Sequence, residues 1–283
     1  MARLSKSMIQ MAIKKDVMLS LNEDVMGNDL TSSLIHKKKL ANGHLKSNQS
    51  GILCGQAWFN QSFKSINNKI KIRWHINDGD AFIKKQLICS FKGPYQDLLK
   101  AERTAINFLQ TLSATATLTH KYVQKIEGYN AKIFDTRKTI PGLRIAQKYA
   151  VRTGGGNNQR LGLYDEILIK ENHIASFNSF GEFLNKLKEK KLIEKAQIEV
   201  ETISQLKLAL TFGAKKILLD NFSIQKIKQA VQINQKKATL EASGNITIKN
   251  IRDYAKTGID RISVGSLTKN IEAIDFSVII SQI

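Results

Sequence analysis

The spacing of apolar residues changes along the chain and predicts two structural regions. Over roughly the first hundred residues, short strand-like runs mix with helical patterns. Helices are expected at the N-terminus, ending near Asn22, and at 56–66, and strands at 41–47, 51–54, 70–76 and 86–92. The segment Asn77-Asp78-Gly79-Asp80 has the composition of a tight turn. Asp29 or Thr31, after the turn residues Gly27-Asn28, is suited to cap the segment that follows.

A long helix is predicted over 98–126. Its apolar residues recur close to the 3.6-residue helical period, among them Leu98, Ala105, Leu109, Leu112 and Ala116. Gly128 follows as a helix stop.

Beyond this helix, short apolar runs alternate with helical stretches. Strands are expected at 132–134, 166–169, 197–200, 216–219, 239–242 and 261–264, and helices at 180–189, 203–212, 223–235 and 248–257. Repeated strand–helix units of this length predict a parallel sheet, and a closed or nearly closed barrel fits best. A doubly wound open sheet is the alternative. No glycine-rich turn of the dinucleotide type follows the first strand, which counts against it.

Composition limits the class of protein without selecting a function. Hydrophobic residues make up 42% of 283 residues, which is ordinary for a globular chain. The net charge of +20 has two interpretations: an anion-binding or nucleic-acid-binding protein, or a solvated lysine surface. The lysines are spread along the whole chain, and no compact basic block contains interleaved aromatics. Both facts disfavour nucleic acid as a partner.

The cysteines and the hydropathy predict a cytoplasmic protein. Cys54 and Cys89 have neither metal-ligand spacing nor the pattern of a disulfide framework, so buried thiols are expected. The N-terminal segment has no uninterrupted apolar core of a signal peptide. No segment approaches the roughly 20 apolar residues that a membrane span requires.

The segment 133–174 is the strongest candidate for an anion-binding site. It contains seven cations, one of the two prolines and a Gly-Gly-Gly run; the cations are Arg137, Lys138, Arg144, Lys148, Arg152, Arg160 and Lys170. A substrate that bears phosphate or several carboxylates requires such fixed cations and backbone N–H groups.

Polar or small residues follow each expected strand of the second region. In a barrel, the carboxyl ends of the strands carry function. Glu199 and Asp220 suit ribose hydroxyls or a hydrated Mg²⁺. The loops after the last two strands, Ser243-Gly244-Asn245 and Gly265-Ser266, suit a phosphate. The alternative is an internal network of Lys–Glu–Asp salt bridges.

Two further features have open interpretations. His173 is either a general acid or base, or a structural histidine. Gly154-Gly155-Gly156 either binds an anion or serves as a hinge. No cluster of His and Cys suggests zinc, and no nucleophile elbow occurs.

Motifs along nearly the whole chain resemble the quinolinate phosphoribosyltransferase family. They are Glu102-Arg103-Thr104-Ala105 with Asn107-Phe108-Leu109, Asp135-Thr136-Arg137-Lys138-Thr139 with Pro141-Gly142, Gly154-Gly155-Gly156, Arg160 with Gly162-Leu163-Tyr164-Asp165, Lys170 with Asn172-His173, Leu219-Asp220-Asn221, and Glu241-Ala242-Ser243-Gly244. The early Glu23-Asp24 and Gly27-Asn28-Asp29-Leu30-Thr31 resemble the N-terminal signature of that family.

The resemblance implies a two-domain α/β enzyme. It implies an N-terminal α/β sandwich over 1–104, an incomplete seven-stranded α/β barrel over 105–268, and a C-terminal segment 269–283 that packs with the first domain. It also implies a head-to-tail homodimer or a larger assembly of such dimers. The implied reaction joins quinolinate and phosphoribosyl pyrophosphate, with Mg²⁺, to give nicotinate mononucleotide, pyrophosphate and carbon dioxide in NAD biosynthesis.

The same resemblance implies roles for individual residues. Arg137, Arg160 and Lys170 would hold the two quinolinate carboxylates, and Arg103 would reach into the site of the neighbouring subunit. Lys138 would meet quinolinate or pyrophosphate. Glu199 and Asp220 would hold ribose hydroxyls and Mg²⁺, and with Lys138 they form the expected catalytic set. Ser243, Gly244, Asn245 and Gly265 would bind the 5′-phosphate.

Two positions depart from the family pattern. Gln159 stands where the family usually has His, and it can donate a hydrogen bond to a carboxylate but carries no charge. Asn245 stands where glycine is commoner.

Two other functions are weighed: a molybdenum-transport-associated relative with the same scaffold, and a basic barrel that binds nucleic acid. Arg137-Lys138 and Lys170 argue against the former, and the strand-end acids argue against the latter.

Overall fold

The computed structural model describes residues 4–26, 29–34 and 39–283, which form two compact units. The N-terminal unit contains the described residues up to His120, together with Thr139–Gly155 and Leu267–Ile283. The barrel unit contains Lys121–Lys138 and Gly156–Ser266. The domain boundaries expected at 104–105 and 268–269 stay a prediction.

The N-terminal unit is built on an antiparallel sheet with the strand order β12-β1-β5-β3. Its strands are β1 (Leu40–Ser47), β3 (Lys71–Trp74), β5 (Leu87–Pro94) and β12 (Phe276–Gln282), and β2 (Gly51–Ile52) pairs separately with β4 (Ala81–Phe82). The C-terminal strand β12 pairs with β1 over seven positions. Segments from the two ends of the sequence therefore share one sheet.

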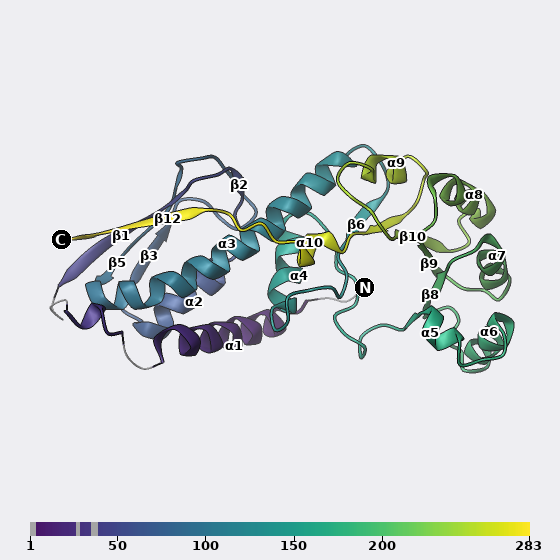
Figure 1. Cartoon of the computed structure of the whole chain (residues 1–283), viewed down its shortest axis with the longest axis horizontal. Coiled ribbons are helices and arrows are strands. Elements are labelled where there is room, and N and C mark those ends of the chain that lie inside the picture. The colour runs from purple at the N-terminus through teal and green to yellow at the C-terminus, as the bar shows by residue number, and fades with distance from the viewer. Residues whose placement is uncertain (1–3, 27–28, 35–38) are drawn as a thin grey trace. The chain divides into compact units, whose positions relative to one another are not determined.

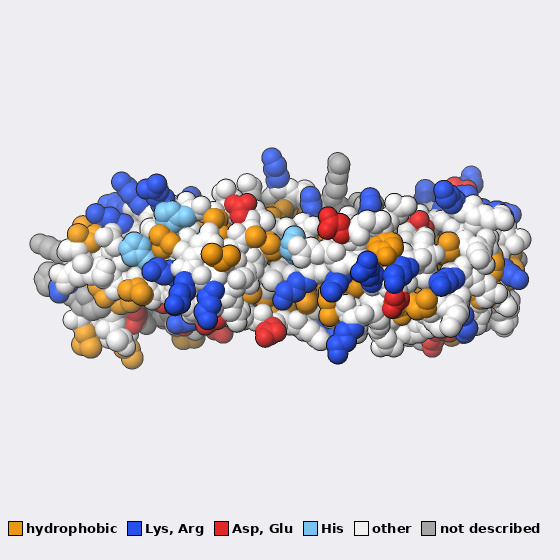
Figure 2. Space-filling model, turned by 90° about the horizontal axis from the view of Figure 1, so that it is seen from above, with side chains coloured by type: hydrophobic (Ala, Val, Ile, Leu, Met, Phe, Trp, Pro, Cys, Tyr) orange, Lys and Arg blue, Asp and Glu red, His pale blue; other side chains and the backbone are white. Residues whose placement is uncertain are grey.

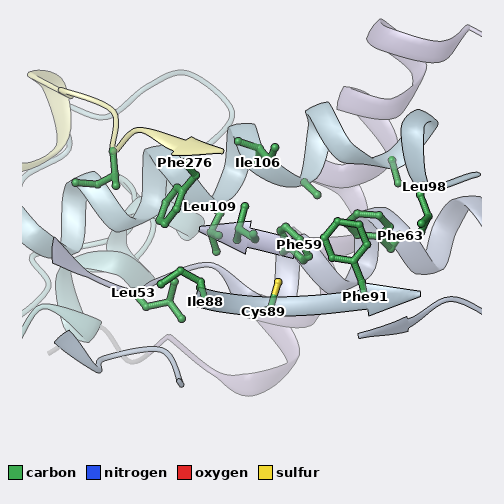
Figure 3. Close-up of a cluster of buried hydrophobic side chains, with 14 of the residues drawn as sticks. Leu53, Phe59, Phe63, Ile88, Cys89, Phe91, Leu98, Ile106, Leu109 and Phe276 are labelled. Atoms are coloured by element: carbon green, nitrogen blue, oxygen red, sulfur yellow. The ribbon is translucent and has the colours of Figure 1, made fainter. Parts of the chain in front are cut away.

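Helices cover this sheet and bury an aromatic core. The helices of this core are α2 (Gln56–Ile66) and α3 (Tyr95–Lys125). On a second apolar cluster they pack with α1 (Lys6–Val25) and α4 (Arg144–Thr153), and the 3-10 helix η1 (Ser32–Leu34) precedes β1. Figure 3 shows Phe59, Phe63 and Phe91 between the sheet and α3. The ring centroid of Phe63 lies 5.0 Å from that of Phe59 and 4.8 Å from that of Phe91. Such tilted aromatic pairs add about 0.5–1.5 kcal/mol each to the burial of their surfaces.

The barrel unit contains a six-stranded parallel sheet with the order β6-β11-β10-β9-β8-β7. Its strands are β6 (Lys132–Phe134), β7 (Leu168–Ile169), β8 (Gln197–Val200), β9 (Lys216–Asp220), β10 (Thr239–Ser243) and β11 (Arg261–Ser263). The first strand pairs with the last, and the others follow in sequence order. This order is that of a curved, barrel-like sheet, which confirms the predicted class and argues against a doubly wound sheet.

The seventh strand implied by the family is reduced to one isolated parallel bridge between Phe134 and Asn157. The backbone N–H of Asn157 donates to Ile133 O at 2.8 Å, and the N–H of Asp135 donates to Asn157 O at 3.0 Å. The polar sequence around Asn157 pairs with β6 at one point and then turns away, so no regular strand is formed.

Helices on the outer side of the parallel sheet connect its strands (Figure 1). They are α5 (Glu171–Ile174), α6 (Phe180–Glu189), α7 (Ile203–Thr211), α8 (Ile224–Asn234) and α9 (Ile251–Ala255), and the short α10 (Ser266–Lys269) follows β11. Ser179, Thr202 and Ser223 cap α6, α7 and α8, because each hydroxyl accepts a backbone N–H of the first turn.

Some elements differ from the sequence-based expectation. α1 continues to Val25 and ends at Met26 in a left-handed conformation. α4, α5, α10, β4 and β12 were not predicted. α4 lies in the segment rich in charge and turns, where its buried positions are Ala, Gln, Lys and Val rather than a uniform apolar stripe. Short helices and two-residue strands carry too few residues to show a period.

The sequence offered Asp29 or Thr31 as the cap of the segment that follows, and the structure selects Asp29. Its Oδ1 accepts the backbone N–H groups of Thr31 and Ser32, both at 3.0 Å. These bonds lower the pKa of Asp29 because they stabilise its charged form. Gly27 and Asn28 lie outside the described residues.

Both cysteines are free and buried, as predicted from their spacing. Desolvation raises the pKa of each thiol, so neither has the low pKa of a reactive cysteine. Across residues 4–26, 29–34 and 39–283, no helix has the length and apolar character needed to cross a membrane. On the face seen in Figure 2, Lys and Arg side chains are scattered rather than gathered into one block.

Candidate active site

The carboxyl ends of the parallel strands bring the predicted polar residues together. Because Ile169 pairs with Ile198, the next residues, Lys170 and Glu199, lie side by side. Asp220 pairs with Ser243 on the neighbouring strand. Residues that are far apart in the sequence thus meet at one edge of the sheet.

Asp135 fixes the loop that follows the isolated bridge. It is fully buried directly after β6, and it accepts the side-chain N–H of Asn158 at 2.7 Å and the backbone N–H of Gln159 at 2.8 Å. Hydrogen bonds to a buried carboxylate are stronger than those between neutral groups. Asp135 therefore holds the 157–159 loop beside the strand end that carries Arg137 and Lys138.

Arg160 is the most deeply buried of the predicted cations in the site. Its side chain donates from Nη1 to Glu166 O at 3.0 Å, and its buried Nε has no hydrogen-bond partner among the described residues. Burial lowers the pKa of Arg160, and the neighbouring charge of Arg137 lowers it further. Two guanidinium groups within electrostatic reach favour the binding of an anion between them.

Lys170 and Glu199 form an ion pair with Nζ and Oε2 2.7 Å apart. The Lys170 side chain is 48% exposed and that of Glu199 is 10% exposed, so the lysine can also reach a ligand. His173 Nδ1 accepts the backbone N–H of Lys170 at 3.0 Å and completes the cap of α5. This bond favours the structural interpretation of His173.

Acidic side chains cluster next to this ion pair. Desolvation raises the pKa of Glu201, and the charges of Glu171, Asp220 and Glu199 raise it further. A small hollow of about 220 Å³ lies among Glu171, Glu199 and Glu201. The described residues contain no group of three or more His, Cys, Asp or Glu side chains placed to hold a metal ion by themselves.

The loops after β9 and β10 fit tightly together. Asn221 and Asn245 adopt left-handed φ values of 54° and 51°, and Gly244, just before Asn245, has a φ of 98°. A Cβ atom on Gly244 would lie 2.0 Å from Asn221 Oδ1. The Asn221 side chain also donates to Asp220 Oδ2 at 2.8 Å. Glycine is therefore required here for the backbones to approach.

Lys138 lies close to the loop after β11. A Cβ atom on Gly265 would meet Lys138 Cδ at 3.3 Å, and the backbone N–H of Lys138 donates to Thr136 Oγ1 at 3.1 Å. Lys138 is exposed, whereas Arg137 is half-buried. The strand end after β6 thus presents two cations beside a loop of small residues.

A buried carboxylate in the barrel interior was missed as a site residue. Glu241 is fully buried on β10; Gln159 and Ser263 donate to its Oε1, and Gln197 donates to its Oε2 at 2.9 Å. Its signal in the sequence was a glutamate between the apolar residues of a strand. Gln159, which departs from the family pattern, thus has a hydrogen-bond partner at the base of the site.

Several predicted residues lie in the N-terminal unit, apart from the strand ends of the barrel unit: Arg103, Arg144, Lys148, Arg152, Gly154 and Gly155. Arg103 is exposed on α3, and Glu102 lies 3.9 Å from its guanidinium. Gly154 packs against α3, because a Cβ atom there would lie 2.3 Å from Ala116 O. The N–H groups of Gly154 and Gly155 bond to carbonyls of α4. Close packing therefore accounts for Gly154, and a left-handed φ of 89° accounts for Gly155.

Comparisons with known proteins identify relatives over nearly the whole chain. The model of the quinolinate phosphoribosyl transferase C-terminal domain matches residues 115–279, and that of the N-terminal domain matches residues 29–113. A probable nicotinate-nucleotide pyrophosphorylase (carboxylating) of Bacillus subtilis is 36% identical over 257 residues, which cover 90% of this chain and 89% of the relative. A mitochondrial quinolinate phosphoribosyltransferase (decarboxylating) of Nicotiana tabacum is 32% identical, with 94% and 81% of the two chains covered.

Solved structures give the same result. The nicotinate-nucleotide pyrophosphorylase of Francisella tularensis is 41% identical and superposes with a TM-score of 0.91 over 95% of this chain and 96% of the other. NadC of Streptococcus pyogenes is 33% identical, with a TM-score of 0.91 and complete coverage of both chains. The chain belongs to the quinolinate phosphoribosyltransferase family.

Proposed function

We propose that this protein is a pentosyltransferase that transfers the phosphoribosyl group of phosphoribosyl pyrophosphate to quinolinate and removes one carboxylate. The products are nicotinate mononucleotide, pyrophosphate and carbon dioxide, a reaction of NAD biosynthesis. The observation that carries the proposal is the division of charge at the strand ends. Cations follow β6 and β7, carboxylates end β8 and β9, and small-residue loops follow β10 and β11.

Quinolinate carries two carboxylates on one ring, and the cations match it. Arg160 supplies a guanidinium whose buried Nε has no partner among the described residues, and Lys170 has N–H donors beyond the one used by Glu199. Arg137 lies within electrostatic reach of Arg160. In the proposal these three hold the carboxylates, and Gln159, whose amide is engaged with Glu241, supports the site through Arg160 next to it.

The phosphorylated sugar takes the other side of the site. Glu199 and Asp220 accept hydrogen bonds from the ribose hydroxyls, and Ser243, Gly244, Asn245 and Gly265 surround the 5′-phosphate. The left-handed φ of 98° at Gly244 and its close packing on Asn221 support this assignment, because glycine lets the loop backbone approach a phosphate. Lys138, next to Gly265, is placed for the pyrophosphate.

The chemistry then follows from charge placement. The lone pair of the pyridine nitrogen attacks C1 of the ribose as the bond from C1 to the pyrophosphate oxygen breaks. Lys138 stabilises the negative charge that develops on the leaving group. The electron pair of the breaking carbon–carboxylate bond then stays on the ring carbon, where the positive charge of the adjacent quaternised nitrogen stabilises it. Carbon dioxide leaves, and this carbon takes a proton from water. No protein acid or base is needed for that second step.

Mg²⁺ belongs to the proposal as a partner of the pyrophosphate. The fit rests on the donor set: Glu199 and Asp220 are carboxylates on adjacent strands, and acidic neighbours raise the pKa of Glu201. Mg²⁺ prefers one or two carboxylates together with substrate oxygens and water. Glu199 and Asp220 would satisfy this preference without a third protein ligand. When bound, the ion supplies charge neutralisation for the pyrophosphate.

A homodimer completes the proposed site. Arg103 is exposed in the N-terminal unit and its ion pair with Glu102 is long, at 3.9 Å, so its guanidinium can bind an anion of another chain. The proposal assigns Arg103 of each subunit to the quinolinate site of its partner. A cytoplasmic location remains the expectation from the sequence.

The test is the formation of nicotinate mononucleotide and ¹⁴C-carbon dioxide from carboxyl-labelled quinolinate and phosphoribosyl pyrophosphate. We expect both products in equal amounts with Mg²⁺ and a large loss with EDTA. Nicotinic acid, which lacks the second carboxylate, is the control substrate and should react poorly. Equal use of both acids, or no turnover of quinolinate by folded protein, would refute the proposal.

A further inference from the structure

A second hollow lies at the end of the barrel opposite the candidate active site. It measures about 850 Å³ and is formed where the chain enters β6, β10 and β11, at the amino ends of these strands. The loops that form it contain 128–131, 234–240 and 255–260. We call it the amino-end pocket. All its lining residues belong to the barrel unit.

The lining of the amino-end pocket is strongly cationic. Lysines from separate loops contribute the positive charges: Lys215, Lys236, Lys237 and Lys256. Asp260 is the acidic residue among the described lining, and its carboxylate already accepts the backbone N–H of Leu240 at 2.8 Å. Lys256 has an exposed contact of 3.4 Å with Asp253, which is worth little in water. The pocket therefore has an excess of cations.

The backbone holds the lysine-bearing turn in an unusual conformation. Gln235 and Lys236 are successive non-glycine residues with left-handed φ values of 46° and 61°. The buried side chain of Asn234 braces this turn, because its Nδ2 donates to Ala238 O at 2.7 Å and its Oδ1 accepts the N–H of Ala238 at 3.0 Å. Left-handed residues are common where a helix ends. Here this helix end places Lys236 and Lys237 at the pocket.

Two of these lysines follow the end of α8, whereas Lys256 is the cap residue at the end of α9. A cation in the last turn of a helix stabilises its carbonyl end. The last turn of α8 contains no basic residue, and Lys236 and Lys237 follow beyond its cap residue Gln235. Lys236 and Lys237 thus lie in the loop that lines the pocket rather than within the helix.

The pocket also has an apolar component, to which Tyr129, Val231 and Ile259 contribute. Its volume lies in the range of sites for nucleotide-sized ligands and exceeds what one phosphate requires. Cations from several loops match a ligand with several charges in a row. We propose that the amino-end pocket binds a small oligophosphate, either inorganic or carried by a nucleotide. This site is separate from the proposed catalytic one.

Titration calorimetry with inorganic triphosphate and with ATP, at fixed ionic strength, tests the proposal. Two cations of the proposed active site are first replaced with Arg137→Gln and Lys138→Gln, because that site also attracts phosphates. In this background we expect one triphosphate per chain to bind. Adding Lys236→Gln and Lys237→Gln should weaken binding about tenfold or more, because two charged contacts are lost.

The matched control is Lys190→Gln with Lys191→Gln in the same background. These exposed lysines follow α6 as Lys236 and Lys237 follow α8, and Lys191 is also left-handed, with φ 56°. This pair removes the same charge but lies outside the pocket, so we expect Kd to change less than about twofold. Circular dichroism checks that each variant is folded.

The two ligands distinguish the sources of the phosphate. A lower Kd for ATP that Tyr129→Ala abolishes identifies a nucleotide, and equal Kd values identify an inorganic oligophosphate. If neither ligand binds in the background without the catalytic cations, or if both lysine pairs weaken binding equally, the proposal is wrong.

Discussion

Lys170 connects the electrostatics of the site to its proposed substrate. Its Nζ contacts Glu199 Oε2 at 2.7 Å while about half of its side chain is exposed. An ammonium group has three N–H donors, so the ion pair and a substrate carboxylate can be bound together. Glu199 thereby orients the lysine as well as contributing its own oxygens.

Arg137→Ala and Lys170→Ala should each strongly reduce catalysis. Loss of one charged hydrogen-bonding partner costs on the order of 2–4 kcal/mol, or roughly 30- to 1000-fold in kcat/KM for quinolinate. Steady-state kinetics measure the effect. Lys188→Ala, which removes an exposed lysine on α6, is the control and should keep normal kinetics. Unchanged constants in both site variants would show that these cations do not bind quinolinate.

Glu241 should make stability depend on pH. Burial raises its pKa above the ordinary 4.5, and the donors Ser263, Gln197 and Gln159 offset only part of this effect. Between the unfolded and the folded pKa the native state holds a proton that the unfolded chain has lost. The contribution of Glu241 to the free energy of unfolding should therefore be greatest below about pH 4.5. Between that pH and the folded pKa it should fall by about 1.4 kcal/mol per pH unit.

Glu241→Gln should remove this contribution, because the amide has no proton to lose. Urea unfolding at a series of pH values measures it, and the difference between wild type and variant isolates the one group from all others. A difference that does not change between about pH 4.5 and neutral pH would show that Glu241 has no raised pKa.

At the scale of elements, close backbone contacts decide where glycine is required. Gly154 ends α4 with an ordinary φ of −77°, so its conformation suits any residue. Glycine is required because a side chain does not fit: a Cβ atom at position 154 would lie 2.3 Å from Ala116 O of α3. Gly181 in α6 is the opposite case, since the nearest atom to its Cβ would lie 3.9 Å away.

Alanine at these two positions should have opposite effects on stability. Gly154→Ala should lower the free energy of unfolding by about 1–3 kcal/mol or more, because α3 and α4 are forced apart. Gly181→Ala should raise it by roughly 0.5–1 kcal/mol, because alanine favours the helix. Urea midpoints at constant slope measure both changes. A Gly154→Ala variant as stable as wild type would contradict the close contact.

At the scale of the whole molecule, the proposed exchange of Arg103 makes activity a property of the assembly. A chain with Arg103→Ala and a chain with Lys138→Ala should each be inactive alone. If Arg103 acts in the partner's site, a mixed dimer contains one site with both residues intact. Random mixing in equal amounts should then restore about a quarter of wild-type activity.

The measurement is product formation after the two variants are unfolded, mixed and refolded together. Mixing Arg137→Ala with Lys138→Ala, which lie in the same unit, is the control and should restore nothing. Absence of recovery in the first mixture, with dimers present by size-exclusion chromatography, would mean that Arg103 acts within its own chain or not at all.

Most elements of this protein follow from its sequence. Period-3.6 and short apolar runs located α2, α3 and all six strands of the parallel sheet to within a few residues, because long-range context rarely overrides a strong pattern. Lys170, Glu199 and Asp220 were correctly expected at one edge of the sheet, because each directly follows or ends an apolar run. The motif resemblance supplied the family, which the comparisons confirm.

Other features depended on contacts between residues that the sequence pattern does not connect. The pairing of β12 with β1, the burial of Glu241 among Gln159, Gln197 and Ser263, and the bond from His173 to the Lys170 backbone have no periodic signal. The sequence alone determined the strongly patterned elements and the residue types that are available for chemistry, because these depend on near neighbours. Only the tertiary structure decided which polar groups are buried together and which loops enclose a cationic pocket, because these depend on how the sheet curves.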